Sequence, residues 1–110
     1  MKLVSKLWGL EKWLVNNELY CAKILRVASG FQCSLHRHLV KDETFVVEAG
    51  SIYLEVGDQT KFLTPGDTVR IPPLMWHRFA NHEEFPAEIL EVSTHHEDAD
   101  VERKEESRKI

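Results

Sequence analysis

The chain consists of many short segments rich in strand-forming residues, separated by turn residues every eight to twelve positions or so. The clearest turns are Gly57-Asp58, which favours a hairpin, and Pro65-Gly66-Asp67. No helical pattern of roughly 10–15 residues alternates with these segments, which argues against an α/β sheet. The pattern therefore predicts an all-β fold, either a barrel or a sandwich. The segments expected to form strands are residues 19–28, 31–38, 44–47, 51–56, 61–63, 68–71, 76–80 and 87–93.

The two ends of the chain differ from this middle part. Residues 1–18 have a leucine spacing that suits a helix, but Gly9 interrupts it. We therefore expect an irregular or strand-like arm there, with Trp8 and Trp13 packed on the core or on a partner subunit. Residues 95–110 are dense in charges of both signs, which predicts a solvated extension or a short terminal helix. The whole chain, residues 1–110, is expected to form a single domain.

Charge and composition argue against several classes of partner. The 110 residues carry 14 Lys or Arg against 18 Asp or Glu, a net charge of −4, so no nucleic acid or anionic membrane surface is indicated. There is no apolar run of about 18 residues for a membrane span, and the N-terminal charges are too interspersed for a signal peptide. Cys21 and Cys33 are accordingly expected to be reduced thiols in a cytoplasmic protein. Since Cys33 is out of phase with His36 and His38, we expect it to point away from them.

Residues 30–50 contain a combination of side chains that is typical of metal sites. His36 and His38 are two residues apart on an expected strand, so they face the same side. Glu43 can join them if the chain turns back as a hairpin. Burying two imidazoles and a carboxylate is costly unless something satisfies them. His77, in the later segment 66–81, is a possible fourth ligand.

The spacing of these residues resembles the two sequence motifs of the cupin superfamily. The first motif is matched by Gly30, His36, His38, Glu43 and Gly50. The second is matched by Gly66, Pro72, His77 and Asn81, and Leu74 stands where the family usually has glycine. The resemblance implies an all-β cupin double-stranded β-helix, a jelly-roll barrel, with one divalent metal held by His36, His38, Glu43 and His77. Three imidazoles and one carboxylate suit Zn, Mn, Co, Fe or Ni.

A finer resemblance covers roughly residues 8–103. The chain is similar to the cupin domains of type II phosphomannose isomerases and to D-lyxose isomerase-like sugar isomerases. The shared residues are Trp8-Gly9, Glu11, Lys23, Ser34-Leu35, Lys41 and the His77-Arg78 pair. His36 stands where the phosphomannose isomerases commonly carry Gln, which leaves both the phosphorylated and the free-sugar substrate open. The resemblance implies a metal-dependent aldose–ketose isomerase acting on a sugar or sugar phosphate.

Such an isomerase needs an acid/base group beside the metal. Glu91 shares one strand face with Ile89 and Ser93; if that face lines the barrel, Glu91 is the candidate base, and otherwise it faces solvent or pairs with a lysine. Lys41, between two expected ligands, should lie near the mouth of the barrel and is the second catalytic candidate. Arg78 and Arg103, like Lys41, are charges that can bind phosphate or sugar hydroxyls. Substrate binding by Lys23 and Glu11 is implied by the resemblance alone.

Two other functions stay open. A non-catalytic sugar-binding cupin would bind its ligand without converting it, and its motivation is that the chain has no appended domain to cover a substrate. An iron-dependent dioxygenase would consume oxygen, although the basic and polar residues expected at the mouth argue against an apolar aromatic substrate. A homodimer is expected, because the resemblance implies sheet-to-sheet pairing and the N-terminal arm could cover a partner's edge strand.

Overall fold

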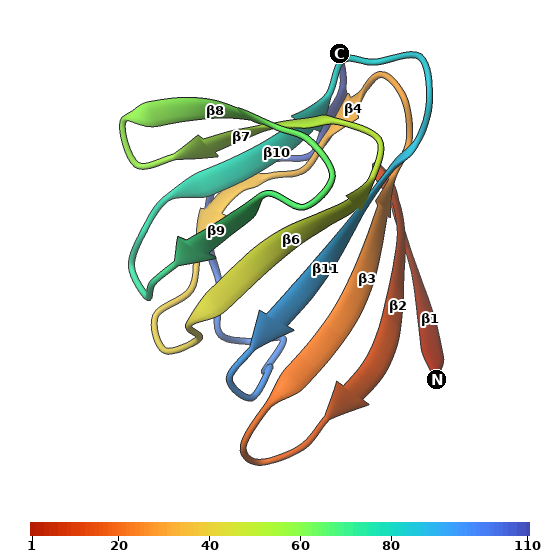
Figure 1. Ribbon diagram of the computed structural model, residues 1–110. Helices are drawn as coiled ribbons and strands as arrows, with labels where there is room; N and C mark the ends of the chain where they lie inside the picture. The colour runs from red at the N-terminus through yellow and green to blue at the C-terminus, as the bar shows by residue number, and fades with distance from the viewer.

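The structure, a computed structural model, describes all residues 1–110, and its regular secondary structure is entirely β (Figure 1). It contains no helix that is long and apolar enough to cross a membrane. The strands are β1 (Lys2–Lys6), β2 (Gly9–Asn16), β3 (Cys21–Val27), β4 (Phe31–Gln32), β5 (Leu35–Arg37), β6 (Glu43–Ala49), β7 (Ile52–Val56), β8 (Gln59–Leu63), β9 (Thr68–Ile71), β10 (His77–Asn81), β11 (Ala87–Ser93), β12 (Glu102–Glu105) and β13 (Arg108–Lys109).

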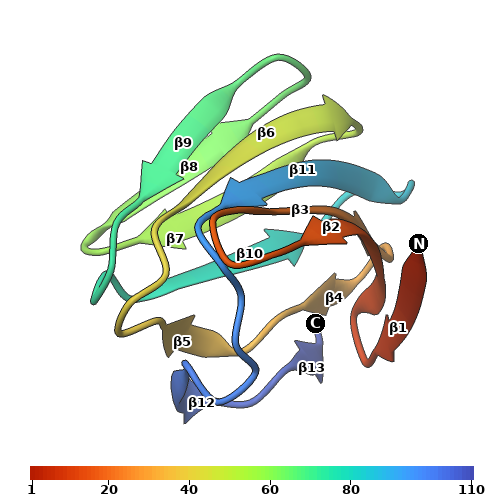
Figure 2. The same cartoon turned by 90° about the horizontal axis from the view of Figure 1, so that it is seen from below.

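The strands form two antiparallel sheets that lie face to face (Figures 1 and 2). The first sheet has the order β1-β2-β3-β11-β6-β9. The second has the order β12-β5-β10-β4-β13, and β7 joins β8 to β10. The central strands of both sheets, such as β3, β6, β10 and β11, turn one face toward the interior between the layers. This arrangement confirms the expected all-β jelly roll.

The interior is apolar at one end and polar at the other. Alternate residues of β3, β6 and β11 are buried, as the period of a strand requires. On β11, Ala87 and Ile89 point into the apolar part, whereas Glu91 and Ser93 point into the polar part. The antiparallel register places Lys23 of β3 opposite Glu91, and Glu43 of β6 opposite Ser93. The polar ends of three neighbouring strands therefore coincide.

The N-terminal arm consists of strands and extends the first sheet. β1 pairs with β2, and β2 pairs with β3. Trp8, in the turn between β1 and β2, is buried in the core, and its ring packs edge-on against Phe79 with 4.9 Å between centroids. A Cβ atom at Gly9 would collide with the carbonyl oxygen of Arg26, so only glycine fits this position. Packing in the core therefore explains why tryptophan and glycine stand at positions 8 and 9.

Residues 31–38 form two strands, β4 and β5, rather than the one expected. Between the pairs Ala80–Gln32 and His77–His36, three steps along β10 match four steps along the opposite chain. This extra residue changes which side chains face inward. Cys33 is consequently buried in the core and lines the same cavity as His36, so the expectation that it points away was wrong. Its Sγ atom accepts a hydrogen bond from the N–H of Phe79 at 3.3 Å.

The charged C-terminal residues do not form a helix. β12 pairs with β5, and β13 pairs with β4, so both add to the second sheet. All residues of these two strands are exposed, as their charges require. Their pairing covers backbone edges of β4 and β5 that would otherwise be open.

Candidate metal centre

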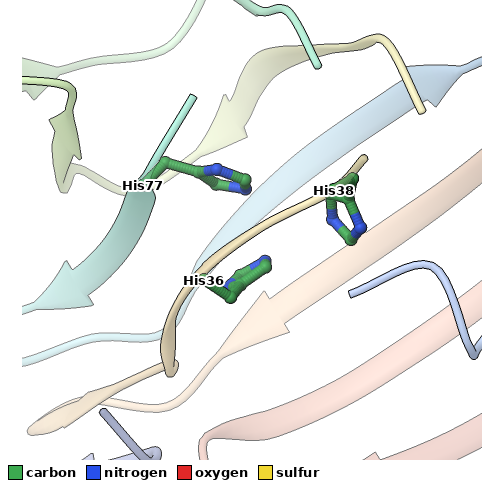
Figure 3. Close-up of side chains that lie close together, drawn as sticks. All are labelled: His36, His38 and His77. Atoms are coloured by element: carbon green, nitrogen blue, oxygen red, sulfur yellow. The ribbon is translucent and has the colours of Figure 1, made fainter. Parts of the chain in front are cut away.

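Three histidines converge at the polar end of the interior (Figure 3). His36 lies in β5, His38 follows that strand directly, and His77 is the first residue of β10. His36 and His77 are direct neighbours across the β5–β10 pair. One ring nitrogen from each histidine lies within 4.8 Å of those of the other two, a grouping that could hold a metal ion. The extra residue between β4 and β5 is what aims His36 and His38 inward.

Each of the three rings contacts a backbone carbonyl through Nδ1. Nδ1 of His36 lies 2.7 Å from the oxygen of Ser34, and Nδ1 of His77 lies 2.9 Å from that of Met75. Nδ1 of His38 lies 2.6 Å from the carbonyl oxygen of Asp100. Because a carbonyl oxygen only accepts, these contacts place the proton on Nδ1 in each ring and leave a lone pair on Nε2. Such orienting contacts are usual for metal-binding histidines.

Glu43, the first residue of β6, supplies a buried carboxylate beside the histidines. Its Oε1 lies 2.8 Å from Nε2 of His77, and its Oε2 lies 3.8 Å from Nε2 of His38. Both carboxylate oxygens and His77 Nε2 are buried without a well-formed hydrogen bond. A lone pair on His77 Nε2 so close to a carboxylate needs a cation or an added proton between them. The donor set therefore fits a divalent transition metal bound by His36, His38, His77 and Glu43.

The electrostatics of the site favour neutral imidazoles at His36 and His38 and an ionised carboxylate at Glu43. Burial, together with the charge that His77 can carry, lowers the pKa of His36 to about 3. Burial and the nearby Lys41 ammonium lower the pKa of His38. Burial alone raises the pKa of Glu43, but the approach of His77 and the charge of Lys41 outweigh it and hold that pKa below its usual range. These are the protonation states in which the side chains bind metal.

A polar cavity of about 140 Å³ adjoins the histidines. Glu91 lines it, as expected if its strand face lines the barrel, and it also pairs with a lysine. Lys41 lies deep inside rather than at the mouth, only 3% exposed. Its Nζ lies 3.1 Å from both Glu43 and Glu91, so it bridges the two carboxylates. Burial alone lowers the pKa of Lys41, but the two carboxylates outweigh it and raise that pKa above its usual value.

Lys23 and Glu11 line the same cavity from the first sheet. Lys23 is 2% exposed, its Nζ lies 3.7 Å from Glu11, and it sits 4.1 Å above the ring centroid of Trp13. The indole N–H of Trp13 donates to Glu11 at 2.8 Å. The structure thus brings these two predicted residues together with Lys41 and Glu91.

The two arginines lie in different places. Arg103 of β12 lines the cavity, and its backbone pairs with that of His36. Arg78 lies outside the cavity, because it follows His77 on β10 and successive residues of a strand face opposite sides. It is held by Glu55 at 2.7 Å and Glu105 at 2.9 Å on the outer face. The structure therefore does not bring Arg78 together with the other predicted site residues.

Seven residues that line the cavity, among them His96, Asp98 and Asp100, lie in the charged segment that the sequence suggested was a solvated extension. Nδ1 of His96 lies 3.2 Å from Lys41 Nζ, and its Nε2 lies 2.8 Å from Asp98. Asp100 contacts His38 and the loop that follows it. The charge pattern of residues 95–110 carries no sequence signal for these contacts.

The fold and the three-histidine group define a jelly-roll protein with a candidate metal site inside the barrel. Residues 23–93 match the family model described as the cupin domain, and the chain belongs to the cupin family. Its matching region contains all four candidate ligands.

The curated relatives include alginate and xanthan biosynthesis proteins and mannose-1-phosphate guanylyltransferases. The alginate biosynthesis protein AlgA of Pseudomonas aeruginosa is 30% identical over 91 residues, which cover 83% of this chain and 19% of that protein. A mannose-1-phosphate guanylyltransferase of Sinorhizobium fredii is 26% identical over 87 residues, 79% of this chain and 17% of the relative. The chain thus spans about a fifth of the length of these relatives.

Solved structures with a similar fold include a sugar phosphate isomerase. A sugar phosphate isomerase of the cupin superfamily from Silicibacter pomeroyi is 29% identical with a TM-score of 0.64, over 71% of this chain and 52% of the other. KdgF from Halomonas sp. matches with a TM-score of 0.81 over 90% of both chains, and its 17% identity shows the fold alone. The chain is therefore a cupin domain related to sugar-phosphate isomerases and sugar-biosynthesis proteins.

Proposed function

We propose that the protein is a metal-dependent aldose–ketose isomerase acting on a sugar or sugar phosphate. The observation that carries the proposal is that three candidate ligands, His36, His38 and Glu43, line the same polar cavity as the buried Lys41–Glu91 pair. His77 groups with the other two histidines. An isomerase of this kind has to bind adjacent oxygens at C1 and C2 and move a proton between those carbons. The similarity to a sugar phosphate isomerase supports the same class.

The metal would be held by His36, His38, His77 and Glu43, and when bound it supplies polarisation of the substrate carbonyl. The proton transfer falls to the chain's own residues. Burial and the charge of Glu43 raise the pKa of Glu91, which makes its carboxylate a stronger base. Glu91 removes the proton from C2 as the C1–C2 double bond forms, then returns it to C1. The hydroxyl proton of O2 passes to O1, so the aldose becomes the ketose without a co-reactant.

Lys41 and the residues around Trp13 would position the sugar. Lys41 stays protonated between its carboxylates, so its positive charge would attract a substrate oxygen in the cavity. Lys23 and Glu11 present a donor and an acceptor to the cavity, and Arg103 adds a charge from β12. A lining of this kind suits the hydroxyls of a polyol better than an apolar ring, which weighs against the dioxygenase alternative.

The test is conversion of aldoses and aldose phosphates by protein reconstituted with Mn²⁺, Zn²⁺ or Co²⁺, followed by ¹³C NMR. We expect one aldose to give its ketose, and chelation or His38→Ala to abolish the conversion. Glu91→Gln should lower the rate by roughly 10²-fold or more, the usual contribution of a general base. Glu88→Gln is the matched control, because Glu88 lies on the outer side of the same strand and pairs with Arg26. No conversion of any sugar by metal-loaded protein would exclude the proposal.

A sugar-binding protein without activity is the second candidate. The observation that favours it is that Glu91 is already paired with Lys41, which neutralises the carboxylate that would act as base. This candidate predicts saturable binding of a sugar, measured by calorimetry, with no ketose after long incubation.

The same proposal includes a cytoplasmic homodimer. Cys21 and Cys33 are buried and unpaired, which supports a reducing compartment. The outer face of the first sheet carries Ile24, Leu90 and Val46 side by side in register across β3, β11 and β6. An apolar stripe on an outer sheet face is what an isologous contact between two copies would bury.

A further inference from the structure

The segment between β11 and β12 crosses from one sheet to the other (Figure 2). It contacts the candidate metal centre at His38. Several of its residues line the cavity, among them His96, Asp98 and Asp100. Asp100 lies outside both sequence motifs and is not among the candidate ligands. Its contacts are nevertheless concentrated on the loop that joins two of those ligands, His38 and Glu43.

The carboxylate of Asp100 accepts hydrogen bonds from three consecutive backbone N–H groups. Oδ1 accepts from Leu39 at 2.7 Å and from Val40 at 3.2 Å, and Oδ2 accepts from Lys41 at 3.0 Å. Three charge-assisted bonds fix the path of the chain immediately after His38. The same residue's carbonyl oxygen contacts Nδ1 of His38 at 2.6 Å. Asp100 therefore holds both the ring of His38 and the loop that leads to Glu43.

We propose that Asp100 is a positioning residue that sets the affinity of the metal centre through His38. The carbonyl that orients the His38 ring is part of the backbone, so no substitution removes it. The side chain is what keeps that carbonyl in place, by fastening residue 100 to the loop after His38. Without the carboxylate, the carbonyl and the ring can move apart, and the Nε2 lone pair is no longer aimed at the metal position.

A second consequence follows from thermodynamic linkage. If the segment around Asp100 improves metal binding, metal binding must stabilise that segment by the same factor. The amides of Leu39, Val40 and Lys41, which donate to Asp100, should exchange more slowly with deuterium when Zn²⁺ is bound. A segment that was only a wall of the cavity would have no such coupling.

The experiment is a calorimetric titration of the metal-free protein and its variants with Zn²⁺. Asp100→Ala should weaken Zn²⁺ binding by roughly 10–100-fold, the usual effect of losing an orienting contact. The matched control is Asp67→Ala, because Asp67 also caps a loop, through the N–H of Thr64 at 2.8 Å, but lies away from the cavity. The control variant should bind Zn²⁺ like the unmodified protein. The absorption spectrum of the Co²⁺-loaded protein should change for Asp100→Ala and not for Asp67→Ala.

Equal affinities and spectra for Asp100→Ala and the unmodified protein would overturn the inference. If the alanine variant does not fold, Asp100→Asn replaces it. Its amide group keeps the volume of the side chain, but only one of its two polar atoms can accept a hydrogen bond. Zn²⁺ binding equal to that of the unmodified protein would contradict the inference for this variant as well. Absence of Zn²⁺-dependent protection at Leu39 to Lys41 in the unmodified protein would also overturn it. The inference rests on the proposed metal centre, but the experiment distinguishes failure of the centre from failure of the positioning role. No Zn²⁺ binding by the unmodified protein would exclude the centre itself, and tight binding unaffected by Asp100 excludes only the positioning role.

Discussion

Leu74 has a backbone conformation that suits glycine. Its φ angle is 71°, in the left-handed region, and the cupin motif usually has glycine at this position. The side chain is 54% exposed, so little buried area would be lost on removing it. We expect Leu74→Gly to raise the free energy of unfolding by about 1 kcal/mol, through relief of the left-handed strain. Urea denaturation measures this, and an unchanged or lower midpoint would show that the turn is not strained.

His36 gives the metal-free protein a defined pH dependence. The pKa of His36 in the folded protein is about 3, below the ordinary value of 6.5. As the pH falls, His36 therefore becomes protonated in the unfolded chain at a higher pH than in the folded protein. The stability that the neutral ring contributes is complete above pH 6.5 or so, and it is lost progressively as the pH falls toward 3.

We accordingly expect the urea midpoint of the metal-free protein to fall between about pH 6.5 and pH 5.5, where carboxylates with ordinary pKa values are still ionised. His36→Gln cannot take up the proton, so its midpoint should depend less on pH over the same interval. The difference between the two slopes, from denaturation at several pH values, is the measurement. Parallel slopes would mean that His36 titrates normally in the folded protein.

The sequence was sufficient to group the candidate metal ligands, but not to predict which side chains neighbour each buried charge. The alternation of a strand places His36 and His38 on one side, and motif spacing adds Glu43 and His77. The structure contributes the bridge from Lys41 to Glu91, because it depends on the register of β6 and β11, which turns alone do not determine. Arg78 could have been separated from the site by alternation, since it follows an inward-facing histidine.

At the scale of elements, Asn81 fastens the end of β10 to its surroundings. Its side-chain NH₂ donates to the carbonyls of Val27 and Phe85, at 3.0 and 2.9 Å, and its oxygen accepts from the N–H of Glu83 at 2.9 Å. It is fully buried, so Asn81→Leu would leave three backbone groups unpaired. We expect a loss of roughly 2–4 kcal/mol in unfolding free energy.

Asn81 lies at the opposite end of β10 from His77, so Zn²⁺ affinity of the folded Asn81→Leu variant should equal that of the unmodified protein. Denaturation and calorimetry on the same preparation check both parts. A large drop in Zn²⁺ affinity with little loss of stability would contradict the structural role given to Asn81, and would make it part of the metal site.

The element boundaries were predictable where alternation and turns agree, and not elsewhere. Residues 87–93 form β11 with the expected limits. Residues 31–38 were misread as one strand, because a single inserted residue leaves no mark in composition. The C-terminal strands were missed because charged, exposed residues carry no alternation, and only pairing with β5 and β4 makes them strands.

At the scale of the whole molecule, the proposed homodimer would form through the outer face of the first sheet. We expect the protein to sediment at twice its mass of 12.8 kDa. Leu90→Lys would place a charge in the centre of the Ile24–Leu90–Val46 stripe and should give monomers. Phe85→Lys is the control, because Phe85 is 73% exposed in a loop away from that stripe. A monomeric unmodified protein, or a dimer unaffected by Leu90→Lys, would contradict the proposed interface.

The central claim is that three histidines and one glutamate hold a single divalent metal inside the jelly roll. Crystals grown with Zn²⁺ and measured at the zinc absorption edge test it most directly. We expect one anomalous peak about 2.0–2.2 Å from Nε2 of His36, His38 and His77 and from a carboxylate oxygen of Glu43. No peak at this position in crystals that contain zinc, with Glu43 bound only to Lys41, would contradict the metal centre and the isomerase proposal that depends on it.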